Sequence, residues 1–278
     1  MKIELAEHYG FCYGVKRAIE IAEQHPKSAT FGPIIHNIDE INRLNREHSV
    51  GLVENVDDAL QYDTIIIRTH GITKENLKAL KKEGKEVINA TCPYVTKPQQ
   101  IVAEMSKKGY TIVIFGDEHH PEIKGVASYT EDKERTYTAL KPEDLIGKAL
   151  GTKVAIVAQT TRKPEDFKKI VAFLATRVVE LRVFNTICNA TFENQDATAD
   201  IAKRADVMIV IGGKNSSNTK QLYSIAKSFC DSSYHIENES ELKKEWFENK
   251  NLCGISAGAS TPDWIIKKVI KKIEELTK

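Results

Sequence analysis

Three of the five cysteines in the chain have the same sequence surroundings. Cys12, Cys92 and Cys188 each follow a short apolar segment and directly precede a segment with helical periodicity, in KIELAEHYGFCYGV, KEVINATCPYVTK and RVFNTICNATFEN. They recur at similar intervals, which indicates that one α/β unit is repeated along the chain. Cys230 follows a helical segment and Cys253 begins an apolar one, so we interpret both as core or incidental thiols.

The chemistry open to the three cysteines is metal or cluster binding. No pair has C-x-x-C spacing, and an odd number of cysteines argues against a disulfide framework. Three thiolates that converge suit an iron–sulfur cluster with one iron open to a substrate, whereas zinc on three cysteines usually takes a histidine as fourth ligand. A single separated cysteine is most often an inert buried thiol, so the hypothesis depends on the repeated pattern.

Further polar residues stand at the ends of other predicted strands. They are His36, Asn37, Thr69, His70, His119, His120, Glu122, Thr160, Thr161, Ser216, Ser217, Asn218 and Ser260. In open parallel sheets, ligands bind outside the carboxyl ends of the strands, so we expect these residues at that edge. Taken singly, each histidine or hydroxyl is as readily a structural residue or a helix cap. Glycine- and hydroxyl-rich loops that open helices can hold an anion through N–H groups, although no nucleotide phosphate loop motif occurs.

The elements that must position these residues alternate along the whole chain. Strands are predicted at 2–6, 28–32, 63–67, 86–90, 111–115, 153–157, 177–184, 206–211 and 253–257. Their apolar runs are continuous rather than alternating, which is typical of parallel strands covered on both faces. Helices are predicted at 14–24, at 96–108 and from Ser260-Thr261-Pro262 onward. The pattern indicates an α/β protein.

Composition narrows the classes of function. The 278 residues are 41% hydrophobic and 28% charged, with 40 basic and 39 acidic side chains and a net charge of +1. A nucleic-acid binder would usually carry a basic excess. The apolar runs are too short for a membrane span, and MKIELAEHYG lacks the pattern of a secretory signal. We therefore expect a cytoplasmic enzyme that binds neither nucleic acid nor membrane.

The motifs, in order, resemble those of the 4-hydroxy-3-methylbut-2-enyl diphosphate reductase family, also called IspH or LytB. They are GFCYGV (10–15), HN (36–37), THG (69–71), ATCPYVTK (90–97), HPE (120–122), QTT (159–161), ICNAT (187–191), GGKNSSN (212–218) and AGAS (257–260) with PD (262–263). Each one is weak alone, but ATCP, HPE and GGKNSSN in this order are highly specific, and the matches span nearly the whole chain.

The resemblance implies a fold and a cofactor. It implies three similar α/β modules with mostly parallel sheets, arranged trefoil-like around a central 4Fe–4S cluster. The modules would be 13–92, 93–188, and 1–12 together with 189–278. Cys12, Cys92 and Cys188 would each supply one ligand, and the fourth iron would take the substrate hydroxyl.

The resemblance also implies a reaction and its residues. The reaction is the two-electron reductive dehydroxylation of an allylic diphosphate to isopentenyl and dimethylallyl diphosphate, the last step of the non-mevalonate isoprenoid route. Flavodoxin or ferredoxin would donate the electrons. Glu122 would be the proton source, supported by Thr191, with Thr160 or Thr161 near the substrate hydroxyl. The diphosphate would be held by His36, His70, His120, Ser216, Ser217, Asn218 and Ser260.

Some positions depart from the family pattern, and other functions stay open. Asn194 stands where arginine is frequent, Lys124 where a neutral or acidic residue is commoner, and His119 receives no role. One alternative is a metal- or thiol-dependent hydrolase that uses His120 and Glu122. Another is a non-catalytic iron–sulfur sensor or phosphate-binding module.

Overall fold

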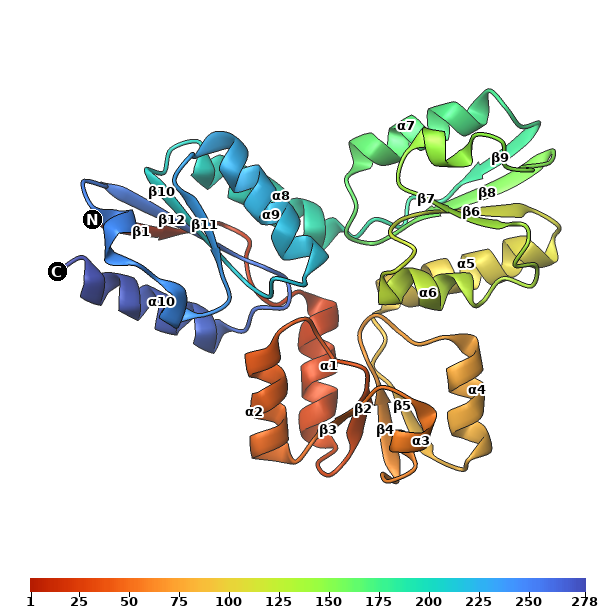
Figure 1. Ribbon diagram of the computed structural model, residues 1–278, viewed down its shortest axis with the longest axis horizontal. Helices are drawn as coiled ribbons and strands as arrows, with labels where there is room; N and C mark the ends of the chain where they lie inside the picture. Colours follow the sequence, from red (N-terminus) through yellow and green to blue (C-terminus); the bar gives the residue numbers. More distant parts are fainter. The chain divides into compact units, whose positions relative to one another are not determined.

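The computed structural model describes residues 1–278, except for the side chain of Thr191 (Figure 1). The chain divides into two compact units. The first unit comprises residues 1–16, 35–47 and 189–278. The second comprises residues 17–34 and 48–188. Helix α1 (Tyr13–Gln24) begins in the first unit and continues into the second.

The first unit contains one four-stranded parallel sheet. Its strand order is β1 (Lys2–Leu5), β12 (Leu252–Ala257), β10 (Val207–Ile211), β11 (Ser233–Ile236). Its helices are α2 (Ile38–His48), α8 (Asn189–Ala202), α9 (Ser217–Phe229) and α10 (Asp263–Leu276), with 3-10 turns η2 (Glu239–Glu241) and η3 (Lys244–Phe247). Figure 1 shows α10 on one face of this sheet and α8 with α9 on the other.

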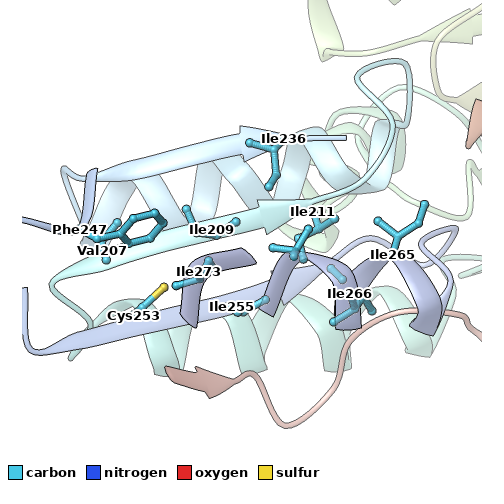
Figure 2. Close-up of a cluster of buried hydrophobic side chains, with 12 residues drawn as sticks. Val207, Ile209, Ile211, Ile236, Phe247, Cys253, Ile255, Ile265, Ile266 and Ile273 are labelled. Atoms are coloured by element: carbon cyan, nitrogen blue, oxygen red, sulfur yellow. The ribbon is translucent and has the colours of Figure 1, made fainter. Parts of the chain in front are cut away.

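Both faces of this sheet are buried, which explains the continuous apolar runs in the sequence. Alternate residues of β10 point to opposite faces because side chains alternate along a strand. Ile209 and Ile211 pack with Ile255 of β12 and the apolar face of α10 (Figure 2). Met208 and Val210 pack with the helices on the other side.

The second unit contains two four-stranded parallel sheets. The first has the order β3 (Gly51–Val53), β2 (Ala29–Phe31), β4 (Thr64–Ile67), β5 (Glu86–Asn89). The second has the order β7 (Thr136–Ala139), β6 (Thr111–Phe115), β8 (Lys153–Ala158), β9 (Glu180–Val183). The helices are α3 (Val56–Ala59), α4 (Lys74–Lys82), α5 (Pro93–Lys107), α6 (Pro121–Ala127) and α7 (Pro164–Ala175), with the 3-10 turn η1 (Pro142–Leu145).

All three sheets share one connectivity. The first strand of each set lies in the interior of the sheet, the second forms the edge next to it, and the third and fourth follow on the other side of the first. In the first unit, β10, β11 and β12 take the first three places and β1 takes the fourth. The N-terminal strand thus completes the sheet of the C-terminal segment. The predicted α/β fold with three similar modules is confirmed, and every strand pairing is parallel.

The structure differs from the sequence-based prediction at several elements. Strands β3, β7 and β11 were not predicted; each pairs with a single neighbour at the outside of its sheet. Helix α5 begins at Pro93 rather than at residue 96, because proline is well tolerated in the first turn. Strand β9 covers Glu180–Val183, less than the predicted range 177–184. Among the described residues, no helix has the length and apolar character needed to cross a membrane.

Candidate active site

The three cysteines of the repeated motif occupy equivalent places in the three sheets. Each follows an edge strand (β1, β5 or β9) and directly precedes a helix (α1, α5 or α8). Each backbone N–H donates to a carbonyl just beyond the neighbouring strand, in the pairs Cys12–Ala259 (3.2 Å), Cys92–Thr69 (3.0 Å) and Cys188–Thr160 (2.9 Å). The fold therefore places every thiol at the carboxyl edge of its own sheet, where ligands bind in parallel sheets.

The remaining two cysteines differ in burial. Cys230 and Cys253 are buried in the core of the first unit, whereas the three motif cysteines are partly exposed. Burial raises the pKa of the Cys253 thiol to about 12. Because metal ligands are thiolates, Cys253 is poorly suited to bind iron. The sequence-based separation of the cysteines into two groups agrees with this difference.

Glu122 is a buried carboxyl group in the second unit, with 1% of its surface exposed. Its two oxygens accept hydrogen bonds from Thr160, one from the backbone N–H and one from the hydroxyl, both at 2.7 Å. Burial raises the pKa of Glu122 to about 7, against the lowering effect of the Thr160 hydrogen bonds and the Arg162 charge. A carboxyl group with this pKa is divided between its two forms at neutral pH and suits general acid catalysis.

Helix α6 and the loop before it place Glu122. His120 caps the helix, Pro121 occupies its first position, and Glu122 lies in the first turn. Nδ1 of His120 accepts the backbone N–H of Glu122 at 3.2 Å, so a neutral His120 carries its proton on Nε2. Gly116, just after β6, lets α6 pack closely against the end of the strand, because a Cβ at this position would lie only 2.7 Å from Cδ1 of Ile123.

His70 lies against His120 in the second unit. Their rings form an edge-to-face contact with centroids 5.3 Å apart and an interplanar angle of 87°. The hydroxyl of Thr69 lies 3.4 Å from Nδ1 of His70 and donates to the carbonyl of Ile34 at 2.8 Å. Two histidines from different sheets thus come together beside the Glu122 helix, and both can donate hydrogen bonds to an anion.

The first unit contributes buried polar groups at two helix starts. Ser216 caps α9 by accepting the N–H of Thr219 at 3.2 Å. The side-chain amide of Asn218 and the hydroxyl of Ser260 are buried and have no hydrogen-bond partner within the residues that the structure describes. Asn218 is 6% exposed and Ser260 8%. Buried polar groups are normally hydrogen-bonded, so unpartnered ones indicate a place for a polar ligand.

Comparisons with known proteins identify the family of the chain. The family model described as LytB protein matches residues 3–274. The chain belongs to the LytB family. It is 64% identical over 276 residues to the 4-hydroxy-3-methylbut-2-enyl diphosphate reductase of Sulfurovum sp. (strain NBC37-1), covering 99% of this chain and 100% of that protein. The enzyme of the same name from Campylobacter concisus (strain 13826) is 60% identical over 276 residues, with the same coverage of both chains.

Two solved structures of the LytB type are similar to the chain. One is (E)-4-hydroxy-3-methyl-but-2-enyl diphosphate reductase, the terminal enzyme of the non-mevalonate pathway, with 44% identity, a TM-score of 0.73, and 99% and 100% of the two chains covered. The other is the E-1-hydroxy-2-methyl-but-2-enyl-4-diphosphate reductase from Plasmodium falciparum. It has 27% identity and a TM-score of 0.88, with coverage of 99% and 88%.

The other residues singled out in this LytB chain differ in their surroundings. The hydroxyl of Thr161 accepts from Nε2 of Gln159 at 3.4 Å, and Ser217 opens α9. His36 lies half-buried in the first unit and directly precedes the Asn37 cap of α2. Asn194 is buried, and its carbonyl accepts the Thr198 hydroxyl at 2.6 Å.

Three positions named in the sequence analysis remain: His119, Lys124 and Thr191. The side chain of His119 is 82% exposed and lies beside Glu118. Lys124 is exposed on α6. The side chain of Thr191 lies outside the described residues, so its expected support of Glu122 stays a prediction.

Sequence reasoning missed Gln159 and Arg162, which hold the loops around Glu122. Oε1 of Gln159 accepts from the N–H of Asp117 at 3.0 Å and from Nε of Arg162 at 3.2 Å. Gln159 is fully buried, and it joins the loop before α6 to the loop after β8. Gln159 is part of the QTT motif (159–161), which could have drawn attention to it, but only the two threonines of that motif were assigned roles.

Proposed function

We propose that this chain catalyses the two-electron reductive dehydroxylation of (E)-4-hydroxy-3-methylbut-2-enyl diphosphate to isopentenyl and dimethylallyl diphosphate. The full-length identity to reductases of this name supports the reaction. The observation that carries the chemistry is the buried Glu122, whose pKa of about 7 lets it hold a proton at neutral pH. Removing an allylic hydroxyl requires such a proton, because hydroxide is a poor leaving group.

The cofactor we propose is a 4Fe–4S cluster held by Cys12, Cys92 and Cys188, since the LytB family comprises iron–sulfur enzymes. The donor set fits: three partly exposed thiols stand in equivalent positions, each at the carboxyl edge of a sheet. When bound, such a cluster supplies electrons and an open iron that acts as a Lewis acid. Flavodoxin or ferredoxin is the proposed electron donor.

The diphosphate contacts we propose are imidazole, hydroxyl and amide side chains. In the first unit they are His36, Ser216, Ser217, Asn218 and Ser260, and in the second they are His70 and His120. The unpartnered Nδ2 of Asn218 and hydroxyl of Ser260 support this assignment, since both can donate hydrogen bonds to phosphate oxygens. Amide, hydroxyl and imidazole donors can bind the anion without filling the site with long cationic side chains.

The proton transfer that we propose starts at the carboxyl group of Glu122. The substrate takes up two electrons and two protons and loses its hydroxyl as water. Thr160 donates to both carboxyl oxygens, which fixes the orientation of the carboxyl group. Thr160 and Thr161 lie on the loop after β8, and we propose that one or both contact the substrate hydroxyl.

The module boundaries and the location in the cell are proposals of the same kind. We propose modules at 13–92, at 93–188, and at 1–12 with 189–278, since each range contains the strands of one sheet. A cytoplasmic location stays a prediction.

The test is to purify the protein without oxygen, measure iron and acid-labile sulfide, and assay it with the allylic diphosphate and a low-potential reductant. We expect about four iron and four sulfide per chain. Cys12→Ser, Cys92→Ser and Cys188→Ser should each lose cluster and activity. The matched controls Cys230→Ser and Cys253→Ser should keep both, since these thiols are buried in the core.

Two outcomes would favour the alternative functions. Turnover by iron-free protein without an electron donor would indicate the hydrolase that uses His120 and Glu122. A full cluster and intact ligand binding, together with no turnover by any preparation, would indicate a sensor or binding module. Retention of the full cluster in all three cysteine variants would contradict the proposed ligands.

A further inference from the structure

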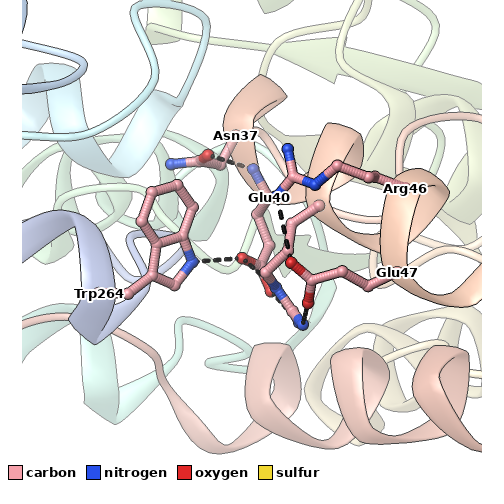
Figure 3. A network of polar contacts seen from close by, with 6 residues as sticks. Asn37, Glu40, Arg46, Glu47 and Trp264 are labelled. Carbon is pink, nitrogen blue, oxygen red and sulfur yellow. Dashed lines mark hydrogen bonds and ion pairs between the residues drawn. The ribbon is translucent and has the colours of Figure 1, made fainter.

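Glu40 is a second buried carboxylate, and it lies outside all of the motifs. It is on α2 of the first unit and is 1% exposed. Arg43 donates to both of its oxygens, from Nη2 at 2.7 Å and from Nε at 3.1 Å. The indole Nε1 of Trp264 donates to Oε2 at 2.7 Å (Figure 3). A buried carboxylate with an arginine partner and three donors is held in one geometry.

The Glu40–Trp264 hydrogen bond joins two loops that carry proposed diphosphate contacts. Glu40 lies in the first turn of α2, where its N–H donates to Oδ1 of Asn37 at 3.0 Å, and His36 directly precedes Asn37. Trp264 lies in the first turn of α10, just after Ser260. The two partners are 224 residues apart in the chain, so the hydrogen bond links two segments that are distant in sequence.

The loop before α9 packs against the backbone of His36, just before α2. Gly213 precedes Ser216, and a Cβ at Gly213 would lie only 2.2 Å from the carbonyl oxygen of His36. The loop that carries Ser216 therefore contacts the His36 backbone through a glycine that no larger residue can replace without a shift. The positions of Ser216 and Ser260 relative to His36 depend on where α2 begins.

We propose that Glu40 and Trp264 are positioning residues for diphosphate binding, an inference that rests on the proposed function. Neither is assigned a contact with the substrate. The hydrogen bond between them fixes the start of α2 against the start of α10, and so sets the spacing of the His36 and Ser260 loops. Binding sites need such supporting contacts, because small displacements of the contacting groups weaken binding.

The kinetic test uses the holoenzyme with Glu40→Gln, Trp264→Phe and the double variant. We expect KM for the allylic diphosphate to rise about tenfold in each single variant, with kcat changed less than about twofold, because binding and not chemistry is disturbed. Both substitutions disturb the same Glu40–Trp264 hydrogen bond. The rise in KM of the double variant should therefore be smaller than the product of the two single rises.

The matched control is Asp206→Asn in the same unit. Asp206 precedes β10 at the opposite edge of the sheet, and its Oδ2 accepts the N–H groups of Asn251 at 2.8 Å and Leu252 at 2.9 Å. This variant also weakens the hydrogen bonds of a carboxylate, but far from the diphosphate loops. Its KM should stay within about twofold of wild type.

A second readout is independent of turnover. Trp246 is the only other tryptophan, so a Trp246→Phe background leaves Trp264 as the fluorescence reporter. Inorganic diphosphate should give a saturable change in Trp264 fluorescence, and Glu40→Gln should weaken its affinity about tenfold.

The outcomes separate this inference from the proposed function. If the wild type turns over the allylic diphosphate and binds inorganic diphosphate, but the Glu40 and Trp264 variants match it or match Asp206→Asn, the positioning role is wrong and the reductase stands. If kcat falls while KM is unchanged, the positioning role is also wrong. If the wild type neither turns over the allylic diphosphate nor binds inorganic diphosphate, both the proposed function and this inference are wrong.

Discussion

Two buried glutamates, one in each unit, differ in their direct hydrogen-bond partners. Glu40 and Glu122 are both 1% exposed. Glu40 is paired with the guanidinium of Arg43 through two hydrogen bonds. Glu122 accepts its hydrogen bonds from the uncharged groups of Thr160, and burial raises its pKa to about 7.

The difference shows that the partner, rather than the depth of burial, decides what a buried carboxyl group does. A cation in direct contact compensates the cost of burying the charge, and the pair then serves as a rigid link. Neutral donors compensate only part of that cost, so the carboxyl group retains a proton near neutral pH. We therefore assign Glu122 to chemistry and Glu40 to position.

The largest effect is expected for Glu122→Gln. The amide can keep both contacts with Thr160 but cannot donate an acidic proton, so kcat should fall by about 10²- to 10⁴-fold. Inorganic diphosphate affinity and cluster content should stay at wild-type values. An activity within threefold of wild type would show that the proton comes from elsewhere.

The next effect is on the pH dependence of stability. The folded-state pKa of Glu122 is about 7, above its ordinary value of 4.5. The folded state therefore binds this proton more tightly, and its stabilising effect is fully present below pH 4.5 and lost as the pH rises through 7. The loss amounts to about 3 kcal/mol, which is the free-energy equivalent of the pKa difference.

Urea unfolding at several pH values, on protein kept free of oxygen, measures this dependence. Between pH 4.5 and 8, Glu122→Gln should lose about 3 kcal/mol less of its unfolding free energy than the wild type. Glu40→Gln should retain the wild-type slope. Parallel curves for wild type and Glu122→Gln would contradict the raised pKa.

A smaller effect is expected for Thr160→Val. The Thr160 hydroxyl lowers the pKa of Glu122, so its removal should raise that pKa further. The alkaline limb of the kcat/KM profile should then move upward by about one pH unit. A shift toward lower pH would mean that another group controls this limb.

The smallest effect is expected for the stability of Trp264→Phe. The ring is nearly retained, and one hydrogen bond to a carboxylate is lost, which costs about 1 to 2 kcal/mol. The second donor, Arg43, keeps Glu40 paired. Chemical unfolding of wild type and variant measures the difference, and a loss above about 4 kcal/mol would show that the indole has a larger packing role.

The sequence predicted those parts of the fold and site that depend on local patterns. Strands such as β6, β8 and β10 are continuous apolar runs because helices cover both of their faces. Strands β3, β7 and β11 were missed because they are short and pair on one side, so their residues need not be uniformly apolar. The three cysteines and Glu122 were found because each stands in a short motif at a strand end.

Contacts between distant segments could not be predicted in the same way. Glu40 reads as an ordinary polar residue of an amphipathic helix, and its burial depends on Arg43 and on a tryptophan 224 residues away. The pairing of β1 with β12, in the sheet of the C-terminal segment, could not be predicted either, because the choice of a partner strand leaves no local pattern in the sequence. The raised pKa of Glu122 also follows from burial, which the HPE motif does not encode.

The most direct test of the central claim is the pH-dependent infrared difference spectrum of the protonated carboxyl C=O stretch, compared between wild type, Glu122→Gln and Glu40→Gln. We expect a band in the wild type that disappears with an apparent pKa of about 7, in line with the buried Glu122 carboxyl. The band should be absent in Glu122→Gln and unchanged in Glu40→Gln. A wild type without the band at pH 6, or its loss in Glu40→Gln instead, would contradict the assignment of Glu122 as the proton donor.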